Sequence, residues 1–316
     1  MQSCSHLVSG NPVFVFGALR SGTTVFRLML DAHPRIKNPG EADYLFDYLH
    51  QSDKGQWRYD LDALRADRIF NAQELKIPAG VDGLRLLEAF LRQLDEKAPG
   101  ILTLNVHRNI QRLHAALPGT RLLHMLRDPR DVARSSIGMG WSGNSYHGVD
   151  HWIRTETQWS AVEKSVNPNN VLELHYEDLF ADCPSTLKRV CEFLGVPFDP
   201  AMLTYHETSS YSPPDRSLVK QWTRNASQNE IVWIEHKAGA LMRARGYETA
   251  TPGTAPSLLR KVFLFLTNKL AVWKFGIRRY GASVFLLEKL TRWLRIGKLN
   301  HGYREIMQRE DIKRLK

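Results

Sequence analysis

The stretch VFVFGALRSGTTVFRLML, residues 13–30, decides the fold. Its first five residues form a short apolar run that ends at Gly17, which is typical of a buried strand. From Thr23 onward, apolar residues recur at helical spacing. Gly17 and Gly22 enclose four residues, as in the phosphate-binding loop G-x-x-x-x-G-K-[ST], but Thr23 occupies the lysine position. The stretch therefore predicts a strand, an anion-binding loop without its lysine, and a helix.

The rest of the chain repeats this alternation of strand and helix. Apolar runs predict strands at 101–105, 121–127 and 171–176. Amphipathic spacing and end signals predict helices at 23–32, 83–97, 149–166 and 184–194, and helices that begin near Asn109 and Pro129. This alternation indicates an α/β fold with a P-loop-like parallel sheet flanked by helices. Ligands of such sheets bind at the carboxyl ends of the strands.

Length and charge suggest a large domain with an appendage. The chain has 316 residues, and a Pro/Gly/Thr-rich linker occupies 249–255. We therefore expect a catalytic domain over 1–250 and a basic amphipathic helical extension over 251–316. The extension from 252 onward contains 15 Lys and Arg against 4 Asp and Glu, a net charge of +11, whereas the remainder carries 28 against 29, a net of −1. The basic extension favours an anionic partner.

The cysteines and the N-terminus bear on the compartment. Cys4, Cys183 and Cys191 show no C-x-x-C pairing, which argues against a disulfide framework or a zinc site. We expect no metal. The first ten residues contain no basic segment followed by an apolar run, so no signal peptide is expected. Together these features predict a cytoplasmic protein in a reducing compartment.

The loop keeps the chemistry of anion binding without lysine. Its glycine backbone lets amide groups converge, and the helix N-terminus adds a favourable dipole. Arg20 supplies a cation inside the loop, and a guanidinium offers forked contacts to tetrahedral oxyanions. Hydroxyl donors and the second glycine complete the candidate site, which comprises Arg20, Ser21, Gly22, Thr23 and Thr24.

The sequence GALRSGTTVFRLMLDAHP followed by GEADYLF resembles the sulfotransferases that use 3′-phosphoadenosine 5′-phosphosulfate (PAPS). Within that superfamily it is most similar to the tyrosylprotein sulfotransferases and their bacterial relatives. The resemblance extends intermittently to about Tyr247, roughly three quarters of the chain. It implies that the loop binds the 5′-phosphosulfate and that the product is adenosine 3′,5′-bisphosphate (PAP).

The same resemblance implies a second anion site for the 3′-phosphate of this cofactor. The family pattern R-D-x-R-x-x-x-x-S matches residues 127–135, which assigns Arg127 and Ser135 to that phosphate. Arg127 follows a predicted strand, and Ser135 lies about two helical turns further on. Arg130 and Arg134 are potential neighbours. By resemblance, Tyr176 lies near the nucleotide and Lys220 contacts a cofactor phosphate.

Two residues are candidates for the catalytic base that removes the acceptor proton. Glu41 matches the glutamate that serves as base in the tyrosylprotein enzymes, provided that burial near Tyr44 and Leu45 raises its pKa. His107 lies where cytosolic sulfotransferases carry a K-x-H pair, and histidine has a suitable pKa unaided. We favour Glu41. The family lysine of that strand is replaced by Asn105, so its charge must come from Arg20, Arg108 or Lys220, or activity is altered.

Three functions follow from these residues. The first is sulfuryl transfer from PAPS to an acceptor hydroxyl, by in-line displacement. The second is a nucleotide-dependent kinase of related fold, which Thr23 at the lysine position disfavours. The third is a catalytically impaired, membrane-associated nucleotide-binding protein. The acceptor is left open among a tyrosyl peptide, a glycan, a lipid and a small molecule.

The glycine-rich segment 138–148 is expected to be an irregular loop that holds the acceptor or packs on the core through Trp141 and Tyr146.

The extension has two amphipathic segments. Residues 283–296 place Val284, Leu287, Leu290 and Leu294 on one face, opposite Glu288, Lys289, Arg292 and Arg295. Residues 258–275 have a broader apolar face whose longest uncharged run, 262–268, is far shorter than the ~20 residues that span a bilayer. Such helices suit peripheral binding to an anionic membrane. Packing on the catalytic domain or on a homodimer partner is the alternative, and nucleic acid is not expected.

Overall fold

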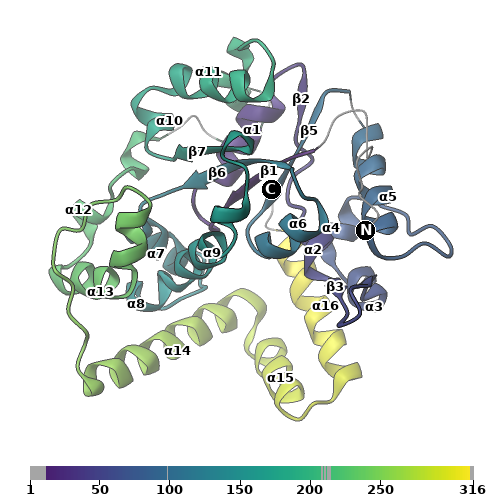
Figure 1. Ribbon diagram of the computed structural model, residues 1–316. Helices are drawn as coiled ribbons and strands as arrows, with labels where there is room; N and C mark the ends of the chain where they lie inside the picture. Colours follow the sequence, from purple (N-terminus) through teal and green to yellow (C-terminus); the bar gives the residue numbers. More distant parts are fainter. Residues whose placement is uncertain (1–11, 98, 208, 210, 212–214, 314–316) are drawn as a thin grey trace. The chain divides into compact units, whose positions relative to one another are not determined.

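The computed structural model of the protein describes residues 12–97, 99–207, 209, 211 and 215–313 (Figure 1). Cys4 and the N-terminal residues for which no signal peptide is expected lie outside the described residues. The chain divides into two compact units. The first comprises Met1–Asp128 and His151–Gln221, and the second comprises Pro129–Asp150 and Trp222–Lys316.

The first unit is built on a parallel sheet, which confirms the predicted fold class. Its five strands lie in the order β2 (Ile36–Lys37), β5 (Ile101–Val106), β1 (Val13–Gly17), β6 (Arg121–Leu126) and β7 (Val171–His175). Four of them match the predicted strands, whereas β2 is too short to produce a sequence pattern. In the central register, Val15 pairs with both Asn105 and Leu123. Strands β5, β1 and β6 therefore end at the same edge.

Alternation along β1 builds a core on each face of the sheet. Phe14 and Phe16 pack into one cluster, and Val13 and Val15 pack into the other. The first cluster includes side chains of α5 (Gly83–Glu96), α6 (Ile110–Ala116) and α9 (Asp150–Ser160). The second includes side chains of α1 (Thr23–Asp31) and α11 (Cys183–Leu194). The first unit is thus a sheet between two helical layers.

Short elements complete the first unit, and the sequence did not predict them. The segment after β2 forms α2 (Tyr44–Asp47), the hairpin of β3 (Leu49–Gln51) and β4 (Trp57–Tyr59), α3 (Leu61–Arg65) and α4 (Arg68–Ala72). Asp60 and Asp67 cap the last two helices through their carboxylates. After β7 come α10 (Asp178–Ala181) and the 3-10 helices η3 (Pro200–Leu203), η4 (Tyr205–Glu207) and η5 (Arg216–Leu218). Before it lie η1 (Glu163–Ser165) and η2 (Pro168–Asn170), so α9 ends earlier than the predicted residue 166.

The second unit is helical. Its elements are α7 (Pro129–Gly138), α8 (Ser145–Gly148), α12 (Trp222–Asn225), α13 (Gln228–Ala244), α14 (Leu258–Tyr280), α15 (Ala282–Trp293) and α16 (Gly297–Lys313). The expectation of an irregular loop over 138–148 is partly wrong. The Asn144 carboxamide accepts a hydrogen bond from the backbone of His147 and caps α8 inside that segment.

The linker at 249–255 packs against α13 of the second unit. The buried carboxylate of Glu235 accepts hydrogen bonds from the backbone amides of Ala250 and Thr251. It also forms an ion pair with Arg130, with an N–O distance of 2.7 Å. The expected boundary after residue 250 means that residues 1–250 fold without the extension, and this stays a prediction.

Helix α14 packs through one side and is exposed on the other. Gly143 donates a backbone hydrogen bond to the carboxamide of Asn268, and Gly140 fits against the ring of Phe275. The opposite side carries a run of exposed apolar residues, which we call the α14 stripe: Leu259, Val262, Phe263, Leu266, Leu270 and Trp273. Among the described residues, no helix combines the length and hydrophobicity needed to cross a bilayer.

Helix α15 differs from its predicted pattern at one position. Leu287, Leu290 and Leu294 are exposed along one side, as the spacing indicates. Glu288, however, was expected on the charged outer face and is buried. Its carboxylate forms ion pairs with Lys289, at 3.0 Å, and Arg292, at 3.5 Å, which offset the cost of burying it.

A buried histidine within the sheet predicts a pH-dependent stability. His124 on β6 lies between the carboxylates of Glu156, at 3.3 Å, and Glu173, at 3.4 Å. Burial lowers the pKa of His124, but the carboxylates outweigh this effect and raise it to about 9. Because the unfolded-state pKa is about 6.5, the charged His124 stabilises the fold fully below that pH. This contribution is lost as the pH rises through about 9.

Denaturant unfolding at pH 7 and pH 10 measures this effect. The wild type should lose more unfolding free energy between these pH values than His124→Gln, which has no titrating group at this position. His50→Gln, on an exposed strand position, should behave like the wild type. An equal loss in the wild type and His124→Gln would contradict the assignment.

Candidate active site

The loop between β1 and α1 presents an uncapped helix N-terminus. Gly22 is the N-cap residue with φ of 86°, and no side-chain cap hydrogen bond forms there among the described residues. The first amides of a helix have no intrahelical partner, and the buried hydroxyl of Ser21 has no hydrogen-bond partner among the described residues. These donors fit an oxyanion at this position.

Arg20 brings positive charge and backbone strain to the same loop. Its φ of 74° lies in the left-handed region, which is costly for a residue with a side chain. Burial and the nearby charge of Arg127 both lower the pKa of Arg20. Two guanidinium groups in proximity repel each other, so an anion between or beside them would be stabilised by both.

Arg127, at the end of β6, is oriented by the loop and by an aromatic ring. It donates hydrogen bonds to the carbonyl oxygens of Arg20, at 2.9 Å, and Leu218, at 2.8 Å. Its guanidinium carbon lies 4.3 Å from the centre of the Tyr176 ring, a cation–π contact. Its buried Nε has no hydrogen-bond partner among the described residues. Arg127 thus retains a donor after its structural contacts are made.

Tyr176 also fixes the shape of the loop. A Cβ atom on Gly22 would lie 2.1 Å from a carbon of the Tyr176 ring. Only glycine fits both this contact and the left-handed backbone. The structure therefore brings together five predicted site residues from three strand ends: Arg20, Ser21, Gly22, Arg127 and Tyr176.

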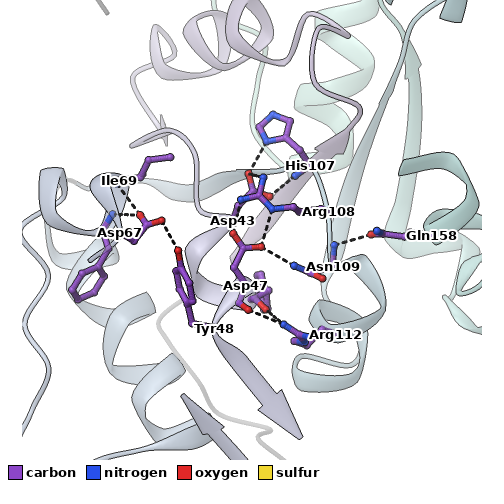
Figure 2. A network of polar contacts seen from close by, with 12 residues as sticks. Asp43, Asp47, Tyr48, Asp67, Ile69, His107, Arg108, Asn109, Arg112 and Gln158 are labelled. Carbon is purple, nitrogen blue, oxygen red and sulfur yellow. Dashed lines mark hydrogen bonds and ion pairs between the residues drawn. The ribbon is translucent and has the colours of Figure 1, made fainter. Parts of the chain in front are cut away.

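Asn105, at the position of the family lysine, has a structural role. Its side-chain amide donates to the carbonyl oxygen of Thr23, at 3.1 Å, and its oxygen accepts from Asn38, at 3.0 Å. The side chains of Asn105 and Asn38 are both buried. Arg108 does not supply the missing charge freely, because its guanidinium is paired with the carboxylate of Asp47 (Figure 2).

His107 lies between a carboxylate and the loop. Its Nδ1 is 2.8 Å from Oδ2 of Asp43, and its Nε2 is 3.2 Å from the hydroxyl oxygen of Thr23 (Figure 2 shows the contact with Asp43). All three side chains are buried. Burial lowers the pKa of His107, but the hydrogen bond and charge of Asp43, together with Glu41, outweigh it and raise the pKa.

Asp43 was not identified from the sequence. It lies two residues after Glu41, in the turn that leads into α2, and nothing in its local pattern distinguishes it from a helix cap. Its other oxygen accepts the backbone N–H of His107, at 2.8 Å. A three-dimensional pairing between residues 64 positions apart has no local signal.

Glu41 is exposed, so the expectation of burial near Tyr44 and Leu45 is wrong. Those two side chains belong to the core. The backbone of Glu41 forms a parallel bridge with Asn105, which places it at the edge where the strands end. Its charge acts on both His107 and Arg108. The carboxylate is therefore close to the loop and open to solvent.

Ser135 and Lys220, two other predicted cofactor-binding residues, belong to different units. Ser135 lies on α7 in the second unit and is half-buried. Lys220 is exposed near the end of the first unit, with φ of 50°. The potential neighbours of Ser135 have structural partners: Arg130 pairs with Glu235 and stacks on Trp222, and Arg134 donates to the carbonyl of Asn225.

The profile of the sulfotransferase family matches residues 12–200. The chain therefore belongs to the sulfotransferase family. Protein-tyrosine sulfotransferase A of Caenorhabditis elegans is 26% identical over 211 residues, which cover 62% of this chain and 52% of that protein. Protein-tyrosine sulfotransferase 1 of Danio rerio is 26% identical over 209 residues, which cover 62% and 56%. The chain thus spans about half the length of these curated relatives.

Solved structures share the fold. The sulfotransferase domain of the Synechococcus PCC 7002 olefin synthase superposes with a TM-score of 0.56 at 19% identity, covering 75% of this chain and 98% of that domain. The sulfotransferase domain of the curacin biosynthetic pathway gives a TM-score of 0.53 at 19% identity, covering 76% and 98%. At such identities, the likeness concerns the fold.

The residues present fit a cofactor of the PAPS type. The uncapped N-terminus of α1, the unpartnered Ser21 hydroxyl and the two neighbouring guanidinium groups suit an anionic phosphosulfate. Gly22, which has no side chain of its own, lies so close to the Tyr176 ring that an added Cβ atom would be 2.1 Å from it. Kinase activity, which the loop alone left open, is disfavoured by the family assignment.

Gly22→Ala tests whether the close contact between Gly22 and the Tyr176 ring matters. The change adds left-handed strain and a collision with Tyr176, whereas Gly119→Ala adds similar strain at φ of 82° with nothing within 4 Å. Gly22→Ala should lower the unfolding free energy by about 1–3 kcal/mol more than Gly119→Ala. It should also weaken PAP binding at least tenfold, measured by calorimetry. Equal effects of the two variants would contradict the assigned role of Gly22.

Proposed function

We propose that the protein transfers a sulfuryl group from PAPS to an acceptor hydroxyl. One observation carries this proposal: Arg20 and Arg127, two mutually repelling cations, lie at an uncapped helix N-terminus beside an unpartnered Ser21 hydroxyl. Family membership supports the same cofactor. The bound cofactor supplies an activated sulfuryl group on a phosphate leaving group.

The chain's residues position this group at both ends. Arg20, Ser21, Gly22, Thr23 and Thr24 would hold the 5′-phosphosulfate through backbone amides, hydroxyls and one guanidinium. Arg127 and Ser135 would bind the 3′-phosphate, Tyr176 would lie near the nucleotide, and Lys220 would contact a phosphate. The cations would stabilise the charge that develops on the leaving oxygen.

Glu41 is the base in this proposal. Glu41 would take the proton of the acceptor hydroxyl as the acceptor oxygen bonds to sulfur, and the electron pair of the broken bond from sulfur to the phosphate oxygen would go to the departing PAP. The carboxylate of Glu41 is exposed and can reach an incoming acceptor, whereas both ring nitrogens of His107 already have partners.

The acceptor class is proposed from the relatives. The curated relatives are named as protein-tyrosine sulfotransferases, which supports a tyrosyl hydroxyl in a peptide. Glycan, lipid and small-molecule hydroxyls remain outcomes of an acceptor screen with labelled PAPS.

Glu41→Gln tests the base with little change in shape. The variant should bind PAP nearly as the wild type does, because the exposed carboxylate of Glu41 forms none of the hydrogen bonds described for Thr23 and Arg127. Its turnover should fall about 10²–10⁴-fold, the usual contribution of a general base. Transfer of labelled sulfate to tyrosyl peptides measures it, and Glu96→Gln on the exposed surface is the matched control. Wild-type turnover in Glu41→Gln would exclude Glu41, and no transfer by the wild type would favour a binding protein.

The second proposal concerns the α14 stripe, which we propose binds an anionic membrane surface peripherally. Helix α14 contains six Lys and Arg, and residues 249–287 contain no Asp or Glu. The stripe thus combines exposed apolar side chains, including Phe263 and Trp273, with cations and no opposing carboxylate on its own helix. Apolar insertion and attraction to anionic headgroups both favour such a surface.

Vesicle co-sedimentation of the full chain tests the membrane proposal. Vesicles of equal parts phosphatidylserine and phosphatidylcholine should bind the wild type, and pure phosphatidylcholine should bind it weakly. Leu266→Glu with Leu270→Glu should reduce binding tenfold or more. Gln56→Glu with Gln111→Glu, at exposed positions of the first unit, matches the charge change and should have little effect.

Two results would contradict the membrane proposal. One is the absence of wild-type binding to the anionic vesicles. The other is a wild-type dimer in solution that the Leu266 and Leu270 changes convert to a monomer, which would assign the stripe to contact between two copies.

A further inference from the structure

Three buried polar side chains form a hydrogen-bonded series that ends at the anion loop, the segment between β1 and α1. Asp43 contacts Nδ1 of His107 at 2.8 Å, and Nε2 of His107 lies 3.2 Å from the hydroxyl oxygen of Thr23. None of the three is more than 4% exposed. Asp43 also accepts the backbone N–H of His107, so the ring cannot move independently of the carboxylate (Figure 2).

The backbone of both residues in the contact between His107 and Thr23 is also held by hydrogen bonds. Thr155 donates its hydroxyl hydrogen to the carbonyl oxygen of His107, at 3.1 Å. Asn105, which shares the same side of the extended chain as His107, donates to the carbonyl oxygen of Thr23. The first residue of α1 is therefore held by its carbonyl and by its hydroxyl at once.

The protonation state of His107 decides how the Thr23 hydroxyl can act. A charged imidazolium donates from both nitrogens, so Nδ1 donates to Asp43 and Nε2 donates to the Thr23 oxygen. The hydroxyl hydrogen of Thr23 is then free to point to another acceptor. In neutral His107 with its hydrogen on Nδ1, Nε2 is an acceptor, and the Thr23 hydroxyl donates back to it.

The charges around His107 favour the imidazolium. Asp43 and Glu41 stabilise it, Arg108 opposes it, and Thr23 and Thr155 carry no charge. Arg108 forms a forked ion pair with Asp47, and its Nη1 also lies 3.6 Å from Oδ2 of Asp43, the oxygen that contacts His107. Thus the strongest charged contact of His107 is the buried carboxylate of Asp43.

We propose that His107 is a positioning residue that, held in its charged form by Asp43, turns the hydroxyl hydrogen of Thr23 towards the anion bound at the N-terminus of α1. Through its contact with Thr23, His107 provides the anion with a hydroxyl donor in a loop that lacks the lysine of the G-x-x-x-x-G-K-[ST] pattern. It also assigns His107 a role other than that of the base. The inference rests on the proposed function, because the anion is the 5′ end of the cofactor.

The first measurement uses the ligand-free protein. Nuclear magnetic resonance of the His107 ring should show the charged form at pH 7.5 in the wild type. Asp43→Asn keeps an acceptor for the backbone amide but removes the charge, and it should make the ring neutral at that pH. A ring that is neutral in the wild type would overturn the proposal.

The second measurement is the dissociation constant of PAP, obtained by calorimetry at pH 7.5. Asp43→Asn and Thr23→Val should each weaken binding about tenfold, as expected for one hydrogen bond to a charged group. Combining them should add nothing further, because both act on the same hydroxyl. All variants are compared with the same ligand at one pH, so titration of the PAP phosphates cancels.

His107→Gln separates positioning from a structural effect. Its amide retains an N–H donor near the position of Nε2 without titrating. It should therefore restore PAP affinity in the Asp43→Asn background to within about threefold of the wild type. His107→Ala lacks the donor and should not restore it. If Asp43→Asn unfolds, His107→Ala alone should weaken PAP binding, Thr23→Val should add nothing to it, and His107→Gln should bind normally.

Additive losses, or wild-type affinity in Asp43→Asn with a neutral ring, would overturn the inference and leave the proposed function intact. Failure of the wild type itself to bind PAP would contradict the proposed function and this inference with it.

Discussion

The parallel register of β5, β1 and β6 is the constraint on which the site depends. Gly17 pairs with Met125 so closely that a Cβ atom on Gly17 would lie 2.4 Å from the Met125 carbonyl oxygen. The three strands consequently end level, and each delivers a different part of the site. β1 leads into the anion loop, β5 leads to His107, and β6 leads to Arg127. Residues more than 100 positions apart in the sequence meet at one edge because of this pairing.

Two guanidinium groups lie near each other at that edge. Arg20 occupies a strained backbone conformation, and its charge is opposed by Arg127. Both features are unfavourable for the ligand-free fold, and a bound anion would offset the repulsion between the two cations. By contrast, Arg108 and Arg130 are neutralised by Asp47 and Glu235. The guanidinium groups of Arg108 and Arg130 are thus paired with carboxylates, whereas Arg127 donates to the carbonyl oxygens of Arg20 and Leu218.

The sequence predicted the sheet and the loop residues that follow β1 because these features are local. A buried strand followed by G-x-x-x-x-G and an arginine can be identified within 12 residues of chain. Asp43, the burial of Glu288 and the contacts of α14 with residues 140–144 were not predicted, since each depends on contacts between distant segments. The exposure of Glu41 was also mispredicted: Tyr44 and Leu45 point into the core, while the preceding turn remains open to solvent.

The central claim is that the loop beginning at Gly17 binds a 5′-phosphosulfate nucleotide and not a nucleoside triphosphate. Calorimetry of the full chain with PAP and with ATP plus magnesium tests it most directly. The account predicts that PAP binds at least tenfold more tightly than ATP, and that Arg127→Ala removes most of this preference. Tighter binding of ATP, or a preference for PAP that Arg127→Ala leaves unchanged, would contradict the account.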